Sequence, residues 1–206
     1  MNLFQQPVMA QPYGKDSLAI FAYGSLLSDP GEKIAAHVIA RIPHRSPWPI
    51  EYARRAKLRG DGPTLVIHRA GGSVQGQLLV LDIQVSALDQ LREWLWEREG
   101  KPAPERIRGM ECGGFGCVLY CDLESTLRDE ELNPKSLAAF AIESVRRSPE
   151  RNAIKYLAQN IGQGIITPLT YAYRDAILRA TGAVDLRQAE EIALDSQTPI
   201  PILPGP

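Results

Sequence analysis

Residues 17–28 read SLAIFAYGSLLS, an apolar run that ends in a glycine-serine pair. The first seven of these residues are rich in strand formers and Gly24 stops the run, so we predict a buried strand followed by a turn. Directly afterwards, Asp29-Pro30-Gly31-Glu32 has the pattern of a helix start, with an Asp cap and proline at the first helical position. Residues 23–28 are therefore predicted to form a strand-to-helix loop.

Working outward from this loop, the chain shows strand patterns first and helix patterns later. The predicted strands cover residues 50–57, 64–69, 74–82 and 115–122, and the predicted helices cover residues 86–99, 134–147, 150–160 and 169–181. Residues 70–73, Ala-Gly-Gly-Ser, are predicted to be a hairpin turn whose glycines supply positive φ. This order favours an α+β fold with a mostly antiparallel sheet that is closed or curled.

The length of 206 residues is that of one ordinary domain, which buries roughly 70% of the surface of its unfolded chain. Neither an internal repeat nor a linker divides the sequence. The two ends are rich in proline, which removes backbone donors. We expect a single domain over residues 17–182, with tails at 1–16 and 183–206.

Charge and hydropathy exclude several classes of partner. There are 23 Lys and Arg against 24 Asp and Glu, a net charge of -1, so the chain lacks the basic surplus of a nucleic-acid binder or a polybasic membrane anchor. It also lacks an apolar run of about 20 residues and a signal-peptide pattern in its first 16 residues. We therefore expect a cytoplasmic protein with neither nucleic acid nor membrane as a partner.

Cysteine and histidine spacing gives no metal or nucleophile motif. Cys112, Cys117 and Cys121 are spaced C-x4-C-x3-C without a nearby histidine, a poor zinc pattern. Cys117 and Cys121 fall on one face of a predicted strand and are predicted to be small buried hydrophobes. Three cysteines cannot supply a disulfide framework. The three histidines are scattered along the chain. No metal site is predicted.

The predicted helix 86–99 carries an anomaly. Leu88, Leu91 and Leu95 form its apolar stripe, and at 100° per residue Glu99 lies only about 20° from Leu88. Glu93 points about 140° away from Leu88. A carboxylate in line with the apolar stripe either reaches solvent past the last turn or is half-buried at the rim of a pocket, where it can take and return a proton. Gly100 supplies the helix stop, and Ser86 with Asp89 forms a capping box at the start.

Two segments together resemble the γ-glutamylcyclotransferase superfamily, which includes the ChaC and AIG2-like proteins. They are Phe21-Ala22-Tyr23-Gly24-Ser25-Leu26 and Leu95-Trp96-Glu97-Arg98-Glu99-Gly100. The text between them is also similar, with Arg59-Gly60 in a turn and Val74-Gln75-Gly76 in a strand. Near the C-terminus, Lys155-Tyr156-Leu157 is similar to the closing helix segment of the family. The resemblance spans residues 18–180.

This resemblance implies a small mixed β-barrel flanked by helices and a reaction that needs no cofactor. In that reaction the α-amino group of a γ-glutamyl compound attacks its own γ-carbonyl, releasing pyroglutamate and an amine, amino acid or peptide. Glu99 is the implied catalytic proton shuttle. The loop residues Tyr23, Gly24, Ser25, Leu26 and Leu27 are implied to bind the substrate, with Gly24 leaving room for close backbone approach. Arg59 and Tyr156 are further predicted substrate contacts.

Three alternatives stay open at this stage. The family glutamate commonly follows Leu-Asp, which here occurs at Leu88-Asp89, so Glu93 is a second candidate for its place. A basic cluster lies near the predicted site and consists of Arg54, Arg55, Arg59 and Arg69. Either one of its guanidinium groups holds the substrate carboxylate, or the arginines are solvated and protect strand edges against aggregation. The chain is either an enzyme or a non-catalytic binding or regulatory module that uses the same pocket for a small anionic ligand. The sequence does not decide the oligomeric state.

Overall fold

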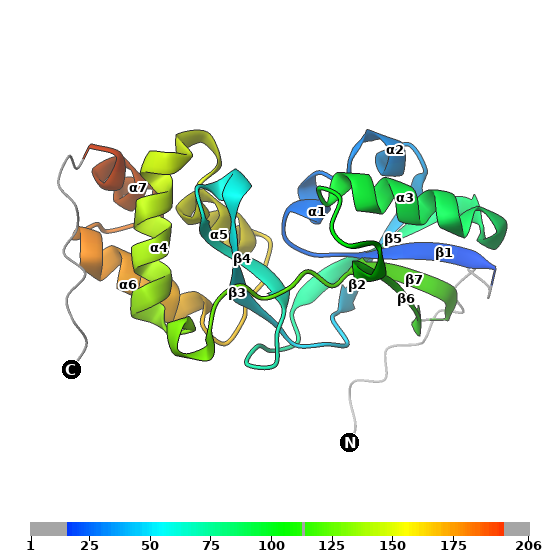
Figure 1. Ribbon diagram of the computed structural model, residues 1–206, viewed down its shortest axis with the longest axis horizontal. Coiled ribbons are helices and arrows are strands. Elements are labelled where there is room, and N and C mark those ends of the chain that lie inside the picture. The colour runs from blue at the N-terminus through cyan, green and yellow to red at the C-terminus, as the bar shows by residue number, and fades with distance from the viewer. Residues whose placement is uncertain (1–15, 113, 196–206) are drawn as a thin grey trace, which may run out of the picture. The chain divides into compact units, whose positions relative to one another are not determined.

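The computed structural model describes residues 16–112 and 114–195 (Figure 1). The described residues form two compact units, each built from two pieces of chain. Unit 1 contains the chain up to His44 together with Gln77–Cys121, and unit 2 contains Arg45–Gly76 together with the chain from Asp122 onward. The sequence pattern, which shows no linker, had predicted one domain over residues 17–182.

Unit 1 is built on a five-stranded sheet in the order β2-β5-β1-β7-β6. The strands are β1 (Ser17–Ala22), β2 (Val38–Arg45), β5 (Gln75–Gln84), β6 (Ile107–Cys112) and β7 (Phe115–Cys121). The apolar run at residues 17–22 is the central strand: β1 pairs antiparallel with β5, where Phe21 is opposite Leu78, and parallel with β7, where Ile20 is opposite Leu119. All residues from Leu18 to Ala22 are buried, as expected for a strand covered on both faces.

The helices of unit 1 lie over one face of this sheet (Figure 1). They are α1 (Ser25–Ser28), α2 (Glu32–Ala35) and α3 (Leu88–Arg98). Leu91 and Leu95 of α3 are fully buried and Leu88 is half-buried, so the predicted apolar stripe is confirmed. The predicted cap at Ser86 is wrong, because residues 85–87 form a short 3-10 turn and α3 begins after Ala87 without a side-chain cap.

The sheet is not a closed barrel, which corrects the expectation that came with the family resemblance. Its edge strands β2 and β6 share no backbone ladder. They meet through side chains, since His44 Nε2 of β2 lies 3.2 Å from Cys112 Sγ of β6. The His44 ring also packs edge-on against Phe21 of the central strand at 6.4 Å. The sheet is therefore curled, and side chains bring its two edges together at one end.

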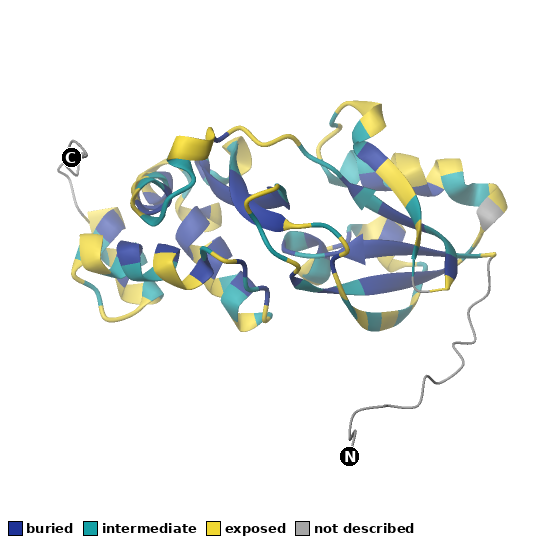
Figure 2. Ribbon diagram, turned by 90° about the horizontal axis from the view of Figure 1, so that it is seen from below, coloured by how far each residue is buried: buried dark blue, intermediate teal, exposed yellow. Residues whose placement is uncertain are grey.

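Unit 2 combines a two-stranded antiparallel sheet with four helices. The strands are β3 (Ile50–Ala56) and β4 (Gly62–Ile67), and the helices are α4 (Pro134–Arg147), α5 (Ala153–Gly162), α6 (Thr170–Thr181) and α7 (Leu186–Asp195). Helix α4 covers the predicted residues 134–147. Figure 2 shows buried residues on β3 and β4 and on one side of the helices. No helix among the described residues is both long and apolar enough to cross a bilayer.

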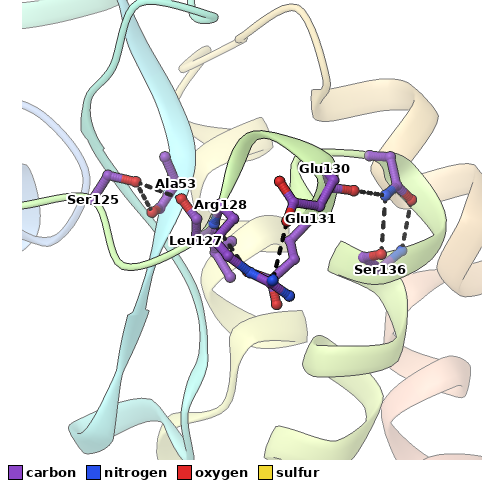
Figure 3. Close-up of polar contacts among 8 residues, drawn as sticks. Ala53, Ser125, Leu127, Arg128, Glu130, Glu131 and Ser136 are labelled. Atoms are coloured by element: carbon purple, nitrogen blue, oxygen red, sulfur yellow. Dashed lines mark hydrogen bonds and ion pairs between the residues drawn. The ribbon is translucent and has the colours of Figure 1, made fainter.

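A chain of polar contacts sets the start of α4 (Figure 3). Ser125 Oγ donates to the carbonyl oxygens of Ala53 and Leu127 at 2.7 and 3.0 Å. The backbone N–H of Arg128 then donates to Glu131 Oε2 at 2.9 Å. Asn133 caps the helix by accepting from Ser136 N, and Pro134 follows at the first helical position, where a missing N–H costs nothing.

The predicted hairpin at residues 70–73 is wrong. Strand β4 pairs with β3, whereas β5 joins the five-stranded sheet, so the two strands that flank these residues are not partners. Gly71 and Gly72 do not have positive φ. Instead, a Cβ on Gly71 would lie 2.2 Å from the carbonyl oxygen of Ile50, and Gly72 forms a bridge with Ile50. Glycine is required here for close approach of two backbones.

Three further elements differ from the sequence prediction. Strands β2 and β6 were not predicted, and helix α7 lies within residues 183–206, which were expected to be a tail. Helix α7 buries only the small residues Ala189 and Ala193, against α4, α5 and α6. The remainder of both predicted tails, residues 1–15 and 196–206, lies outside the described residues.

Candidate active site

The loop after β1 is shaped by Gly24, whose φ of 58° and ψ of -133° place it in a region open almost only to glycine. From there the chain turns directly into the single helical turn α1, so part of the predicted loop is helical. Leu26 points inward and is buried, whereas Ser25 and Leu27 are half-buried. The half-buried Tyr23 places its ring 6.0 Å from that of Phe21.

The end of α3 is fixed by its own backbone. Glu99 is the C-terminal cap, Gly100 has a φ of 80°, and the amides of Gly100 and Lys101 bond to the carbonyls of Glu97 and Trp96 at 3.1 and 2.8 Å. This pair of bonds is the Schellman motif, and the predicted stop at Gly100 is confirmed. The Cα of Glu99 therefore has a defined place at the end of a regular helix.

A single guanidinium connects these two segments. Arg98 Nη2 donates to Ser25 Oγ at 3.2 Å and to the Asp29 carbonyl at 2.6 Å, and Arg98 Nε donates to the same carbonyl at 2.9 Å. Its Nη1 donates to Glu99 Oε1 at 2.8 Å. The structure therefore brings Glu99 and the loop that contains Ser25 to one place within unit 1.

Glu99 is the half-buried glutamate of this helix end. Its side chain is 15% exposed and that of Arg98 is 16% exposed, so solvent screens their ion pair only partly. Glu93 is exposed, which agrees with the helical-wheel argument against it. Glu97 pairs with Lys33 of α2 at 2.7 Å, and this hydrogen bond lowers the pKa of Glu97. Of the three glutamates, Glu99 alone is joined to the loop.

The two predicted substrate contacts in unit 2 touch each other. The guanidinium of Arg59 lies over the ring of Tyr156, 4.1 Å from its centroid, and the Tyr156 ring also packs edge-on against Tyr52. Tyr156 is buried within α5. This pair and the Glu99 site belong to different units.

The other arginines of the predicted cluster also lie in unit 2. Arg55 donates from Nε to the Asp61 carbonyl and stacks on Phe140, whereas Arg69 pairs with Asp129 at the surface. Arg54 is half-buried opposite Thr64 on β4. Two of these three guanidinium groups are thus engaged with protein partners.

The cysteines are partly buried thiols, and burial raises the pKa of both Cys112 and Cys117. Cys121 is buried, as predicted, whereas the prediction for Cys117 is wrong because that residue is only half-buried. The described residues contain no group of three or more His, Cys, Asp or Glu side chains placed to hold a metal ion.

A separate open groove of about 530 Å³ lies along α3. It is lined by Arg92, Glu93, Trp96, Pro104, Glu105 and Ile107. None of residues 23–28 lines it, and neither does Glu99. We place the candidate site at Glu99 and not in this groove. Among the described residues, Arg92 forms no ion pair with either carboxylate of the groove and pairs with Asp89 instead. At the Glu99 site, by contrast, four hydrogen bonds of Arg98 hold the residues together.

Arg98 is the site residue that sequence reasoning missed. On a helical wheel Arg98 lies about 20° from Leu91 and about 140° from Glu93, so it belongs to the apolar stripe and not to the polar face. Its long stem carries the guanidinium from this stripe to the loop after β1. The available signal was this position of an arginine in line with the apolar stripe, directly before Glu99.

No protein-family model matches this chain, and no curated protein matches it. Among solved structures, the chain is similar to the crystal structure of a γ-glutamyl cyclotransferase specific to glutathione from yeast, with 17% identity and a TM-score of 0.44. The match covers 79% of this chain and 98% of that chain.

Proposed function

We propose that this protein is a cofactor-free γ-glutamylcyclotransferase that acts on a small γ-glutamyl compound and releases pyroglutamate. The observation that carries the proposal is the connection of Glu99 to Ser25 through Arg98. It places a half-buried carboxylate beside the glycine-serine loop, and these are the two segments on which the family resemblance rests.

The proposed reaction closes a five-membered ring. The α-amino nitrogen of the substrate attacks its γ-carbonyl carbon and forms a C–N bond, and the γ-amide C–N bond then breaks. Protons leave the attacking nitrogen and arrive at the departing nitrogen, so atoms balance without added water. One carboxylate between the two nitrogens can carry these protons, which is the role we assign to Glu99.

The loop residues Tyr23, Gly24, Ser25, Leu26 and Leu27 are proposed to hold the folded-back substrate. Since the attack is intramolecular, binding in a near-attack conformation supplies much of the rate. The amide of Leu27 donates to the Gly24 carbonyl at 3.2 Å, whereas those of Ser25 and Leu26 have no acceptor inside the turn and are proposed donors to an oxyanion or a substrate carboxylate. Substrate contacts from Arg59 and Tyr156 stay a prediction.

The experiment is a screen of γ-glutamyl dipeptides, γ-glutamyl amines and glutathione with detection of pyroglutamate. We expect turnover of at least one compound by the wild-type protein and loss of at least about 100-fold in Glu99→Gln, which cannot carry the proton. Circular dichroism of the variant should match that of the wild type. Full activity in Glu99→Gln would refute the assignment, and tight binding of a compound without turnover would identify a binding module instead.

A further inference from the structure

We propose that Arg98 is a positioning residue that divides the Glu99 carboxylate into an anchored oxygen and a proton-carrying oxygen. The inference rests on the proposed function. Arg98 Nη1 holds Glu99 Oε1 at 2.8 Å. No side chain or backbone group among the described residues bonds to Oε2, and the Glu99 side chain keeps 15% of its surface exposed. Oε2 is thus the oxygen presented to a ligand.

The anchor is itself held firmly. Every nitrogen of the Arg98 guanidinium has an acceptor: Nε and Nη2 share the Asp29 carbonyl, Nη2 also meets Ser25 Oγ, and Nη1 meets Glu99. A planar guanidinium with its acceptors in place loses little further freedom when it fixes a carboxylate. The backbone on both sides is also set, by the turn at Gly24 and by the Schellman motif at Gly100.

The division matters for a proton shuttle. A carboxylate that rotates freely presents either oxygen to the substrate, and misplacement of a reacting group by about 1 Å can cost about 100-fold in rate. With Oε1 anchored, the same oxygen faces the attacking and the departing nitrogen in turn. Arg98 therefore acts through Glu99, and it touches neither nitrogen itself.

The test compares Arg98→Gln and Arg98→Lys with Arg92→Gln, an exposed arginine of the same helix. We expect Arg98→Gln to lower kcat about tenfold or more while KM changes by less than about threefold, because the variant misplaces a reacting group without removing the substrate loop. Arg98→Lys, which keeps the charge but cannot reach all three acceptors, should fall between Arg98→Gln and the wild type. Arg92→Gln should match the wild type.

A double variant separates positioning from general support of the fold. If Arg98 acts through Glu99, adding Arg98→Gln to Glu99→Gln should leave the residual rate unchanged, since the two changes affect one unit. A further fall in the residual rate, or an unchanged kcat in Arg98→Gln alone, would overturn the proposal. If Arg98→Gln does not fold, Arg98→Lys supports the same comparison.

A crystal structure of the Arg98 variant gives a readout that does not need activity. We expect the Glu99 carboxylate to lose its fixed orientation toward the loop while α3 keeps its course. A Glu99 side chain that stays in place without the guanidinium would refute the positioning role. Failure of the proposed function would give a different result. Glu99→Gln would then keep full turnover, or no γ-glutamyl compound would be turned over at all. In either case Glu99 would still be displaced in the Arg98 variant.

Discussion

Ser25 and Glu99 bond to the same guanidinium group, at 3.2 and 2.8 Å, although Ser25 lies 73 positions before the arginine that supplies it. The serine belongs to the first turn after the central strand, and the glutamate caps the helix that covers the same sheet. The contact converts two distant sequence motifs into one local arrangement, and it makes the choice between Glu93 and Glu99 testable.

Glu93→Gln should leave turnover of a γ-glutamyl compound unchanged within about twofold, because this side chain is exposed and has no connection to the loop. The measurement is pyroglutamate release by Glu93→Gln and Glu99→Gln under the same conditions. Loss of activity in Glu93→Gln with retention in Glu99→Gln would assign the family glutamate to position 93.

Gly24→Ala should lower both the stability of unit 1 and the rate. A side chain at a φ of 58° and a ψ of -133° costs about 1 to 3 kcal/mol of unfolding free energy, and the loop must shift to relieve it. Gly182→Ala is the matched control, since Gly182 ends α6 with a φ of 71° and has open space around it. Denaturant unfolding should show losses in both variants, with activity lost only in Gly24→Ala. Equal activity in the two would remove Gly24 from the site.

Gly71→Ala should destabilise unit 2 by about 2 kcal/mol or more, because its Cβ would overlap backbone atoms of Ile50, which cannot move aside. Gly72→Ala, whose Cβ would meet Pro168 at 3.2 Å, should cost about 1 kcal/mol or less. Urea unfolding of the two variants provides the comparison. A free energy of unfolding for Gly71→Ala equal to that for Gly72→Ala would contradict the close-approach explanation.

The pH dependence of stability should contain a contribution from Glu51. This carboxylate is buried in unit 2, where it accepts from Thr167 Oγ1 at 2.6 Å and from the amides of Tyr52 and Leu169. Burial raises its pKa above 4.5. A raised carboxyl pKa means that the folded state holds the proton more tightly, so this stabilisation is complete below pH 4.5 and is lost as pH rises through the folded pKa.

Glu51→Gln should therefore lack the fall in unfolding free energy above pH 4.5 that the wild type shows. Glu131→Gln is a control of opposite sign, because the Arg128 amide lowers the pKa of Glu131 and its stabilisation is lost as pH falls. Urea unfolding across this pH range measures both. If the unfolding free energies of the wild type and Glu51→Gln changed in parallel with pH, burial of Glu51 would make no contribution to the pH dependence of stability.

Helices and strands with a clear cap or apolar pattern in their own sequence were predicted correctly. The α+β class is confirmed, and α4 was predicted over its observed range because Asn133 and Pro134 mark its start and an apolar stripe runs along its length. The buried strand β1 was predicted because its residues form an unbroken apolar run. By contrast, β2 contains Pro43 and three arginine or histidine side chains, so its alternation was too polar to read as a strand.

The sequence did not predict which strands pair with each other. The glycines at 71 and 72 are typical of a turn between paired strands. The local sequence does not indicate that β4 pairs with the preceding strand β3 and that β5 belongs to the other sheet. Helix α7 was missed although Leu186, Ala189 and Ala193 follow helical spacing, because residues 183–206 were predicted to be a proline-rich tail. At the site, the glutamate and the loop were predicted separately. Arg98 could have been noticed because it lies in line with the apolar stripe, but its bonds to Ser25 and Glu99 are seen only in the structure.

The assembly of each unit from two pieces of chain has a consequence for synthesis on the ribosome. Central strand β1 emerges first, yet its partners are β5 and β7, and β7 ends only at Cys121. The two-stranded sheet of unit 2 is made in the interval and must itself wait for α4 to α7. Since domains fold as units during synthesis, neither unit is complete when its first segment leaves the exit tunnel. The apolar stretch 18–22 thus stays without its native partners during translation, so the nascent chain is most prone to aggregation before β7 emerges.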